Sequence, residues 1–210
     1  MSHLKDVLKK IRKELKEKER IREKAQKDMR KATSLSKQAI LLIHQKRLRE
    51  AKRQIEKAKE IISKLNNASA THPDIIYSGL FDAALQEFSE ANILLKLVEE
   101  KFTTPEEIGV PSVDYVLGLA DVIGEYRRMA LDALREGKIG KSENCLRIMD
   151  EIYTELMAMD EAYMLVPGLR RKCDMARRII EATRGDITQE VRRTALEKSL
   201  KSLEKRIGKT

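Results

Sequence analysis

The sequence contains no tryptophan, and aromatic residues make up only 4% of its 210 residues. Residues that interrupt helices are also scarce, with nine glycines and four prolines. Ala, Leu, Glu, Lys and Arg dominate instead, which is the composition of long helices rather than of a β-sheet. We therefore predict an all-α fold, an antiparallel bundle of about seven helices.

Long uncharged runs and closely spaced cysteines are missing as well. No uncharged run reaches the roughly 18 residues that a membrane-spanning helix needs, and the N-terminus lacks the apolar core of a secretory signal. We therefore expect a soluble, cytoplasmic protein. Cys145 and Cys173 show no CxxC spacing. We expect both to be small buried hydrophobic residues rather than a disulfide or a zinc site.

Charge is distributed unevenly along the chain, although the net charge is +9. Residues 1–65 contain 22 basic and 9 acidic residues, whereas residues 66–110 contain 2 basic and 8 acidic residues. This asymmetry indicates a surface that binds a polyanion around an acidic pocket. The alternative is that the N-terminal charges only form the solvated face of a long helix.

Apolar spacing and turn residues divide the chain into seven predicted helices. Ser112 is expected to cap one helix, and Gly137 and Gly185 to end two others. We expect residues 1–187 to form one domain and residues 188–210 to contain a charged C-terminal helix whose role the sequence does not define. The predicted helices span residues 2–44, 46–65, 74–102, 112–136, 141–165, 169–183 and 188–207.

Two pairs of acidic residues lie on the apolar side of their predicted helices. In the third helix the inward stripe, with steps of four and three residues, includes Glu87, and Glu90 follows three residues later on the same face. In the fourth helix Asp121 and Glu125 lie four residues apart, and Gly124 leaves space between them. The loop between these helices is short, so we expect the two helices to be antiparallel neighbours.

Four clustered carboxylates would repel one another and would lose their hydration on burial, so such a cluster is rare without a neutralising cation. All the ligands would be hard oxygen atoms, which favours Mg²⁺ or Mn²⁺ over zinc or copper. The alternative is that each acidic pair only forms salt bridges on a helix surface.

Four blocks of sequence resemble the translin and translin-associated factor X (TRAX) family. Their order and spacing match that family over most of residues 80–187, whereas the basic first two helices fit by pattern only. The blocks are ALQEFSEA (84–91), VDYVLGLADVIGEYRRMAL (113–131), LREGKIGKSENCLRIMDEIYTEL (134–156) and VPGLRRKCDMARRIIEATRGDI (166–187).

The resemblance implies an endoribonuclease that depends on Mg²⁺ or Mn²⁺. The acids of TRAX-type subunits lie in an LQExxE motif and a DxxGE motif, whereas translin-type subunits bind RNA and DNA but lack the full set. The resemblance also implies a homo-oligomer, an octamer that encloses RNA, with single-stranded DNA as a further ligand. On this sequence the catalytic and metal-binding residues would be Glu87, Glu90, Asp121 and Glu125.

Basic residues around the start of the second helix are candidate RNA-binding residues, because they would hold the phosphate backbone without reading its sequence. The alternative is that they are ordinary solvated charges. The candidates are Lys46, Arg47, Arg49, Lys52 and Arg53.

Three further side chains have two interpretations each. Arg128, three residues beyond Glu125, would contact a phosphate or form a salt bridge with Glu125. His72 and Tyr77 would stack on bases, or they are a loop histidine and a packed tyrosine.

The sequence as a whole leaves three classes of function open: a metal-dependent endoribonuclease, a translin-like RNA- or DNA-binding protein without catalytic activity, and a helical scaffold.

Overall fold

The computed structural model describes residues 2–207, without the side chains of Ser2, Asp160 and Ala162. Every regular element in this part of the chain is a helix, with eight α-helices and one 3-10 helix. The predicted all-α fold is confirmed. The chain forms two compact units, Met1–Gly118 and Leu119–Thr210, which we call the first and the second unit. One domain over residues 1–187 stays a prediction.

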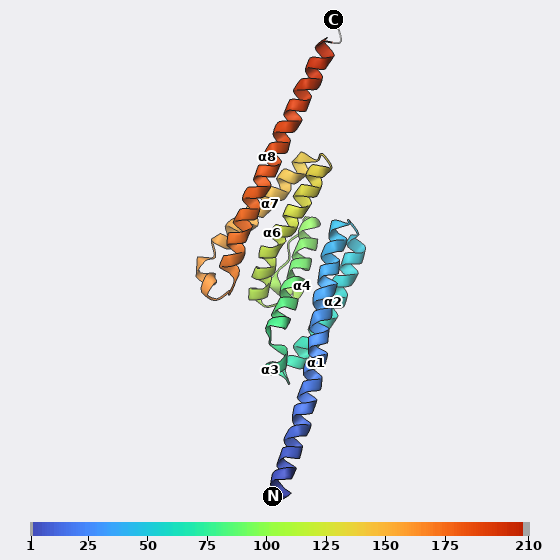
Figure 1. Cartoon of the computed structure of the whole chain (residues 1–210), viewed down its shortest axis with the longest axis vertical. Coiled ribbons are helices and arrows are strands. Elements are labelled where there is room, and N and C mark those ends of the chain that lie inside the picture. Colours follow the sequence, from blue (N-terminus) through green and yellow to red (C-terminus); the bar gives the residue numbers. More distant parts are fainter. Residues whose placement is uncertain (1, 208–210) are drawn as a thin grey trace. The chain divides into compact units, whose positions relative to one another are not determined.

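The first unit is built on a hairpin of two long helices (Figure 1). Helix α1 (Ser2–His44) and helix α2 (Leu48–Ser69) are joined by a short turn, and α4 (Gly79–Val98) packs against both. The short helices α3 (Pro73–Ile76) and α5 (Pro105–Ile108) lie in the connections. The buried stripe of α2 recurs every three or four residues, which places it on one helix face: Ala51, Ile55, Ala58, Ile62 and Leu65.

After two helices of the first unit, a residue other than glycine adopts the left-handed conformation. After α1, which ends as predicted at His44, Lys46 adopts a left-handed conformation with φ 62°. The amide of Arg47 donates to the carbonyl of Leu42 at 2.9 Å, the bond that defines a Schellman motif. Glu100, with φ 57°, follows α4 in the same way. This motif ends α4 at Val98, four residues before the predicted position 102.

Two boundaries near residue 70 also differ from the prediction. Helix α2 continues to Ser69 through the segment predicted as a break from residue 66. The helix predicted over residues 74–102 is divided into α3 and α4, because Ser78 is extended, with φ −147° and ψ 157°. Pro73 begins α3, where its missing N–H costs no hydrogen bond.

The second unit contains most of α6 (Ser112–Arg135), α7 (Ile139–Met157), the 3-10 helix η1 (Asp160–Met164) and α8 (Leu169–Ile207). Helix α7 packs against α8 (Figure 1). Helix α6 has Ser112 as its first helical residue rather than as its cap, because the amide of Tyr115 donates to the carbonyl of Pro111. Gly137 follows the end of α6 with φ 70°, as predicted. The helix predicted to reach residue 165 ends at Met157.

Helix α8 is continuous from Leu169 to Ile207, so the predicted stop at Gly185 is wrong. A glycine inside a helix costs about 1 kcal/mol relative to alanine, which packing can offset. Thr183 and Ile187, on either side of Gly185, are both buried and continue the packed face of the helix. The charged C-terminal segment is therefore the end of α8 rather than a separate helix.

The cysteines and the hydropathy of the helices agree with what the sequence predicts. Cys145 and Cys173 are both buried and unbonded to each other, as predicted. Within residues 2–207, no helix combines the length and the hydropathy that crossing a membrane requires.

Candidate functional site

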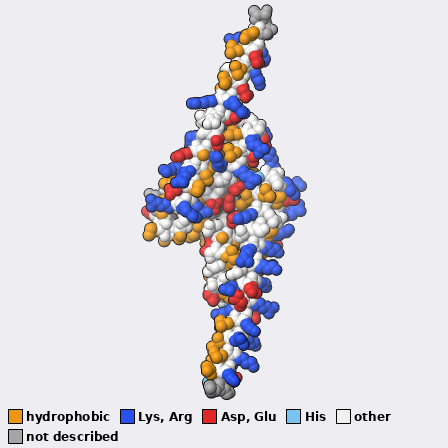
Figure 2. Space-filling view, viewed as in Figure 1, with side chains coloured by type: hydrophobic (Ala, Val, Ile, Leu, Met, Phe, Trp, Pro, Cys, Tyr) orange, Lys and Arg blue, Asp and Glu red, His pale blue; other side chains and the backbone are white. Residues whose placement is uncertain are grey.

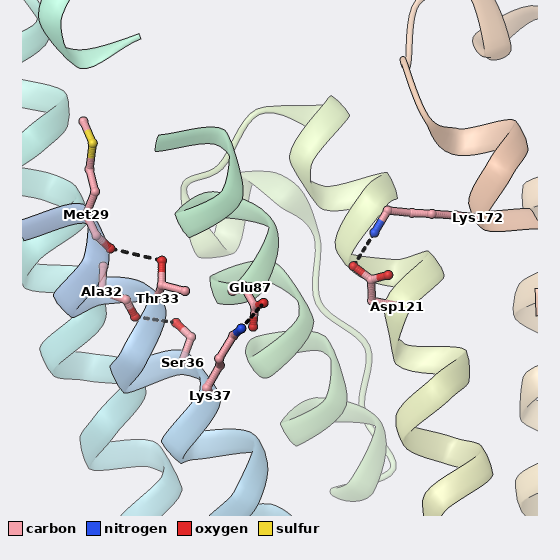
Figure 3. A network of polar contacts seen from close by, with 8 residues as sticks. All are labelled: Met29, Ala32, Thr33, Ser36, Lys37, Glu87, Asp121 and Lys172. Atoms are coloured by element: carbon pink, nitrogen blue, oxygen red, sulfur yellow. Dashed lines mark hydrogen bonds and ion pairs between the residues drawn. The ribbon is translucent and has the colours of Figure 1, made fainter. Parts of the chain in front are cut away.

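The acidic pair of α4 lies on a largely buried part of that helix. Glu90 is only 8% exposed, and Glu87 is half-buried. The Oε1 atom of Glu87 lies 3.2 Å from Nζ of Lys37 on α1, and the two side chains point toward each other (Figure 3). A lysine therefore already neutralises Glu87 within the first unit.

Gly118 allows α6 to approach the acidic turn of α4. A methyl group at residue 118 would lie 2.7 Å from Cβ of Ser89, 2.8 Å from the carbonyl oxygen of Gln86 and 2.9 Å from the amide nitrogen of Glu90. Two of these three atoms belong to the backbone, which cannot move without shifting the helix. Gly118 thus sets the distance between the two helices at the turn that contains Glu87 and Glu90.

The acidic pair of α6 lies in the second unit. Asp121 forms an ion pair with Nζ of Lys172, which comes from α8 (Figure 3). Glu125, one turn further along α6, is half-buried. A small cavity of about 120 Å³ beside Asp121 is lined by Gly124, Lys172 and Ala176, among others. A methyl group at residue 124 would meet no described atom within 4 Å, so Gly124 borders open space, whereas the tight helix contact is at Gly118.

The four predicted acids supply suitable donor atoms for a hard cation, because all of them are carboxylate oxygens. Glu87 and Glu90 belong to the first unit, and Asp121 and Glu125 to the second. Among the described side chains, no group of three or more His, Cys, Asp or Glu residues is arranged to hold a metal ion. A cation would also have to replace Lys37 at Glu87 and Lys172 at Asp121. The chemistry of the ligands therefore fits Mg²⁺, and lysines hold two of the four carboxylates.

The predicted RNA-binding residues differ in how they are held. Arg47 binds Glu50 through two nitrogen atoms, at 2.6 and 2.7 Å, and Lys52 lies 2.5 Å from Glu99, the residue that follows α4. The hydrogen bond with Glu50 raises the pKa of Arg47 further above its usual value. Lys46 occupies the left-handed position after α1. The remaining two candidates, Arg49 and Arg53, are exposed and form no ion pair with a described residue.

Two of the other three candidates for nucleic-acid contacts, Arg128 and Tyr77, are exposed. Arg128 is exposed, so its side chain is accessible from solvent. Tyr77 is 64% exposed, so the interpretation as a packed tyrosine is wrong. Its hydroxyl lies 3.2 Å from Oγ of Ser69. His72 is half-buried and directly precedes α3.

Arg127 is a structural residue that the sequence pattern did not single out. Its Nη1 atom donates to Oγ1 of Thr183 at 2.7 Å and to the carbonyl of Ile179 at 3.4 Å. Its Nη2 atom lies 3.2 Å from Asp186. Together with Lys172 and Asp121, these bonds connect α6 to α8 inside the second unit. The partners lie more than 50 residues apart in the chain, so no local motif identifies them.

Asp114 is a buried acid that the sequence analysis also missed. It lies in the first turn of α6 and is only 6% exposed. Burial, together with the nearby charge of Asp82, raises its pKa to about 6, against an opposing hydrogen bond with Gln86.

The two cysteines do not support thiol chemistry at neutral pH. Burial raises the pKa of Cys145 and of Cys173 and keeps both thiols protonated.

Known proteins match this chain over most of its length. The sequence model of the Translin family matches residues 17–183. A curated relative, an uncharacterized protein of Methanocaldococcus jannaschii, is 36% identical over 157 residues, which are 74% of this chain and 69% of that protein. The chain belongs to the Translin family, and the predicted family resemblance is confirmed.

Solved structures have the same fold. The crystal structure of AfC3PO matches with a TM-score of 0.77 and 35% identity, over 87% of this chain and 96% of that chain. The structure of AfC3PO with duplex RNA matches with the same score and identity, over 87% and 95%. Apo-NeC3PO, with a TM-score of 0.78 at 22% identity over 87% and 96%, supports the fold alone.

Proposed function

We propose that this protein binds RNA and cleaves it as an Mg²⁺-dependent endoribonuclease, in the form of a homo-oligomer. RNA binding is supported by the similarity to AfC3PO, one of whose structures is a complex with duplex RNA. Cleavage is supported by the resemblance of the motifs LQEFSE and DVIGE to those of TRAX-type subunits. An octamer, as in that family, and cytoplasmic localisation both stay predictions.

The observation that carries the catalytic part is the position of the two acidic motifs on α4 and α6. Their carboxylates are buried or half-buried, and two of them have a lysine from another helix as counter-charge. Half-buried acids need such counter-charges because their hydration is incomplete. A divalent cation fulfils the same electrostatic requirement. The proposed metal ligands are Glu87, Glu90, Asp121 and Glu125.

Each group would have a distinct task. Bound Mg²⁺ supplies Lewis acidity toward a phosphate oxygen and lowers the pKa of a bound water. One carboxylate, for which we propose Glu90, orients or deprotonates the attacking water. Arg128, which is exposed, would contact a phosphate group. Arg49 and Arg53, exposed and without an ion-pair partner among the described residues, hold the RNA backbone electrostatically.

A second function is binding of RNA or single-stranded DNA without turnover. The ion pairs of Glu87 with Lys37 and of Asp121 with Lys172 favour this second function, because they neutralise these carboxylates without a metal ion. In that case the acids are structural, and the basic surface alone carries the function. Figure 2 shows Lys and Arg side chains along the length of α1, which would serve either function.

The decisive experiment is cleavage of end-labelled RNA, as single strand and as duplex, in Mg²⁺ and in EDTA. Asp121→Asn keeps the shape of the side chain and removes its charge. We therefore expect normal assembly and a loss of cleavage activity of at least about 10- to 100-fold. Asp132→Asn is the matched control, because Asp132 lies on the same helix and its carboxylate pairs, among the described residues, with exposed Arg135 at 3.3 Å. We expect the control to cleave like the wild type.

Three outcomes separate the candidate functions. Equal cleavage by both variants would indicate a contaminating nuclease and remove the catalytic proposal. If every preparation shows a salt-sensitive gel shift and none cleaves RNA, the protein binds nucleic acid without catalytic activity. A gel shift that is absent, or that does not respond to salt, would leave only a scaffold.

A further inference from the structure

The N-terminal end of α1 has an exposed apolar stripe that continues the packed face of the helix. Lys18 and Arg22 separate the stripe from the first buried residues of α1, Ala25 and Met29. The side chains of the stripe are between 44% and 59% exposed and are visible along one side of α1 in Figure 2. With steps of four, three and four residues, they occupy the a and d positions of a coiled coil: Leu4, Leu8, Ile11 and Leu15.

The C-terminal end of α8 has a second exposed stripe with the same steps. Its first residue, Leu196, lies nine residues beyond buried Ile187, which is about two and a half turns and therefore the opposite side of the helix. The stripe thus faces away from the side on which α8 packs. Its side chains are between 50% and 74% exposed: Leu196, Leu200, Leu203 and Ile207.

We propose that the α1 stripe of one copy of this chain binds the α8 stripe of a second copy as an antiparallel coiled coil. The equal step pattern allows four matched layers, which alternate a and d positions as antiparallel coiled coils require. This contact deepens the proposed homo-oligomer and is independent of nuclease activity. The four layers are Leu4 with Ile207, Leu8 with Leu203, Ile11 with Leu200, and Leu15 with Leu196, the second residue of each pair coming from the other copy.

The charges beside the stripes select this pairing. In an antiparallel pair, the residue that follows each d position faces the equivalent residue of the other helix. Lys5 then lies opposite Glu204 of the other copy, and Arg12 opposite Glu197. Opposite charges at such flanking positions determine which helices associate and in which direction. Among the described residues, Glu197 has an exposed contact with Arg193 at 3.8 Å.

Pairing of identical stripes is unfavourable by the same rule. Two antiparallel α1 stripes would place Lys5 opposite Arg12, and two antiparallel α8 stripes would place Glu197 opposite Glu204. Like charges at these positions are destabilising. Both stripes also lie outside residues 17–183, which the Translin family shares. The contact is therefore an addition to the family fold rather than a part of it.

Cysteine crosslinking between two different chains tests the proposal. One chain carries Leu8→Cys, and a second, differently tagged chain carries Leu203→Cys. After mixing and mild oxidation, we expect a disulfide-linked dimer at least about fivefold more abundant than with either chain alone. Leu196→Cys in place of Leu203→Cys is the register control, because it lies seven residues, or about 10 Å, away along the helix.

The other outcomes would overturn the proposal. Efficient crosslinking of either chain alone would show that identical stripes pair. A single chain carrying both cysteines that forms only an internal disulfide would show an intramolecular contact. Equal crosslinking with Leu196→Cys would exclude the register, and no crosslink in any mixture would exclude the contact.

Charge reversal supplies a second, independent arm. Lys5→Glu with Arg12→Glu on the first chain should lower the crosslink yield about fivefold at low salt. Adding Glu197→Lys with Glu204→Lys on the second chain should restore the yield, because each facing pair again has opposite signs. Failure of the second pair of substitutions to restore the yield would contradict the proposed alignment. RNA cleavage by the same mixtures reports separately on the nuclease proposal.

Discussion

Gly118→Ala should destabilise the protein, although alanine favours helices over glycine. The added methyl group would lie 2.7 Å from Cβ of Ser89 and within 2.9 Å of two backbone atoms of α4. Forcing extra volume into such a contact costs about 1–3 kcal/mol. Alanine inside a helix contributes about 0.5–1 kcal/mol in the opposite direction. The net effect is a loss of about 1 kcal/mol in the free energy of unfolding, within a range of about 0–2.5 kcal/mol.

Gly124→Ala is the matched control, six residues later on the same helix. A methyl group there would meet no described atom within 4 Å, so only the helix preference of alanine remains. We expect a gain of about 0.5–1 kcal/mol. Urea denaturation measures both variants at one fixed protein concentration, because the proposed assembly would contribute to stability. Equal or greater stability of Gly118→Ala than of Gly124→Ala would refute the close approach of α6 to the acidic turn of α4.

Four further predictions concern single side chains. Burial raises the pKa of Asp114 from 3.8 to about 6, so the folded protein keeps this proton at a pH where the unfolded chain has released it. The free energy of unfolding should therefore fall as the pH rises from about 4 to about 6. In urea denaturation, the advantage of Asp114→Asn over the wild type should grow by about 1–3 kcal/mol between pH 4 and pH 7. Arg127→Met should lower the free energy of unfolding by about 1–3 kcal/mol, because it removes bonds between α6 and α8, and an unchanged urea midpoint would contradict this. Replacing Arg49 and Arg53 by serine should weaken RNA binding and reduce the slope of log affinity against log salt by about 1.4–1.8, and an unchanged slope would show that neither residue contacts phosphate. Lys172→Met should tighten Mn²⁺ binding in calorimetric titration, since the cation no longer competes with the lysine at Asp121, and unchanged affinity would argue against ligation by that residue.

Local sequence signals predicted the helix ends that are marked by a clear change in apolar spacing or by a glycine. The long first helix ends where its spacing predicts, and Gly137 ends α6 in the left-handed conformation that glycine adopts readily. Gly185 shows the limit of this rule, because packing of neighbouring residues keeps α8 helical through it. Lys46 and Glu100 show the converse, since both occupy left-handed positions that usually call for glycine.

The candidate site was less accessible to sequence reasoning, because its determinants come from distant parts of the chain. The motifs identified the acids, but the lysine beside Asp121 lies 51 residues away, and no local spacing indicates it. The need for a small residue at position 118 depends on the distance between two helices, which periodicity alone does not define. Of the two interpretations of these acids, a metal site or salt bridges, the structure contains salt bridges at Glu87 and Asp121, both with lysines of other helices.

Anomalous diffraction from crystals soaked in Mn²⁺ tests the central claim most directly. We predict a manganese peak whose protein ligands are carboxylate oxygens of the LQEFSE and DVIGE motifs, with Lys37 and Lys172 displaced from Glu87 and Asp121. Peaks only at other acidic residues, or both lysine pairs retained without manganese at these carboxylates, would contradict the proposed metal-dependent nuclease.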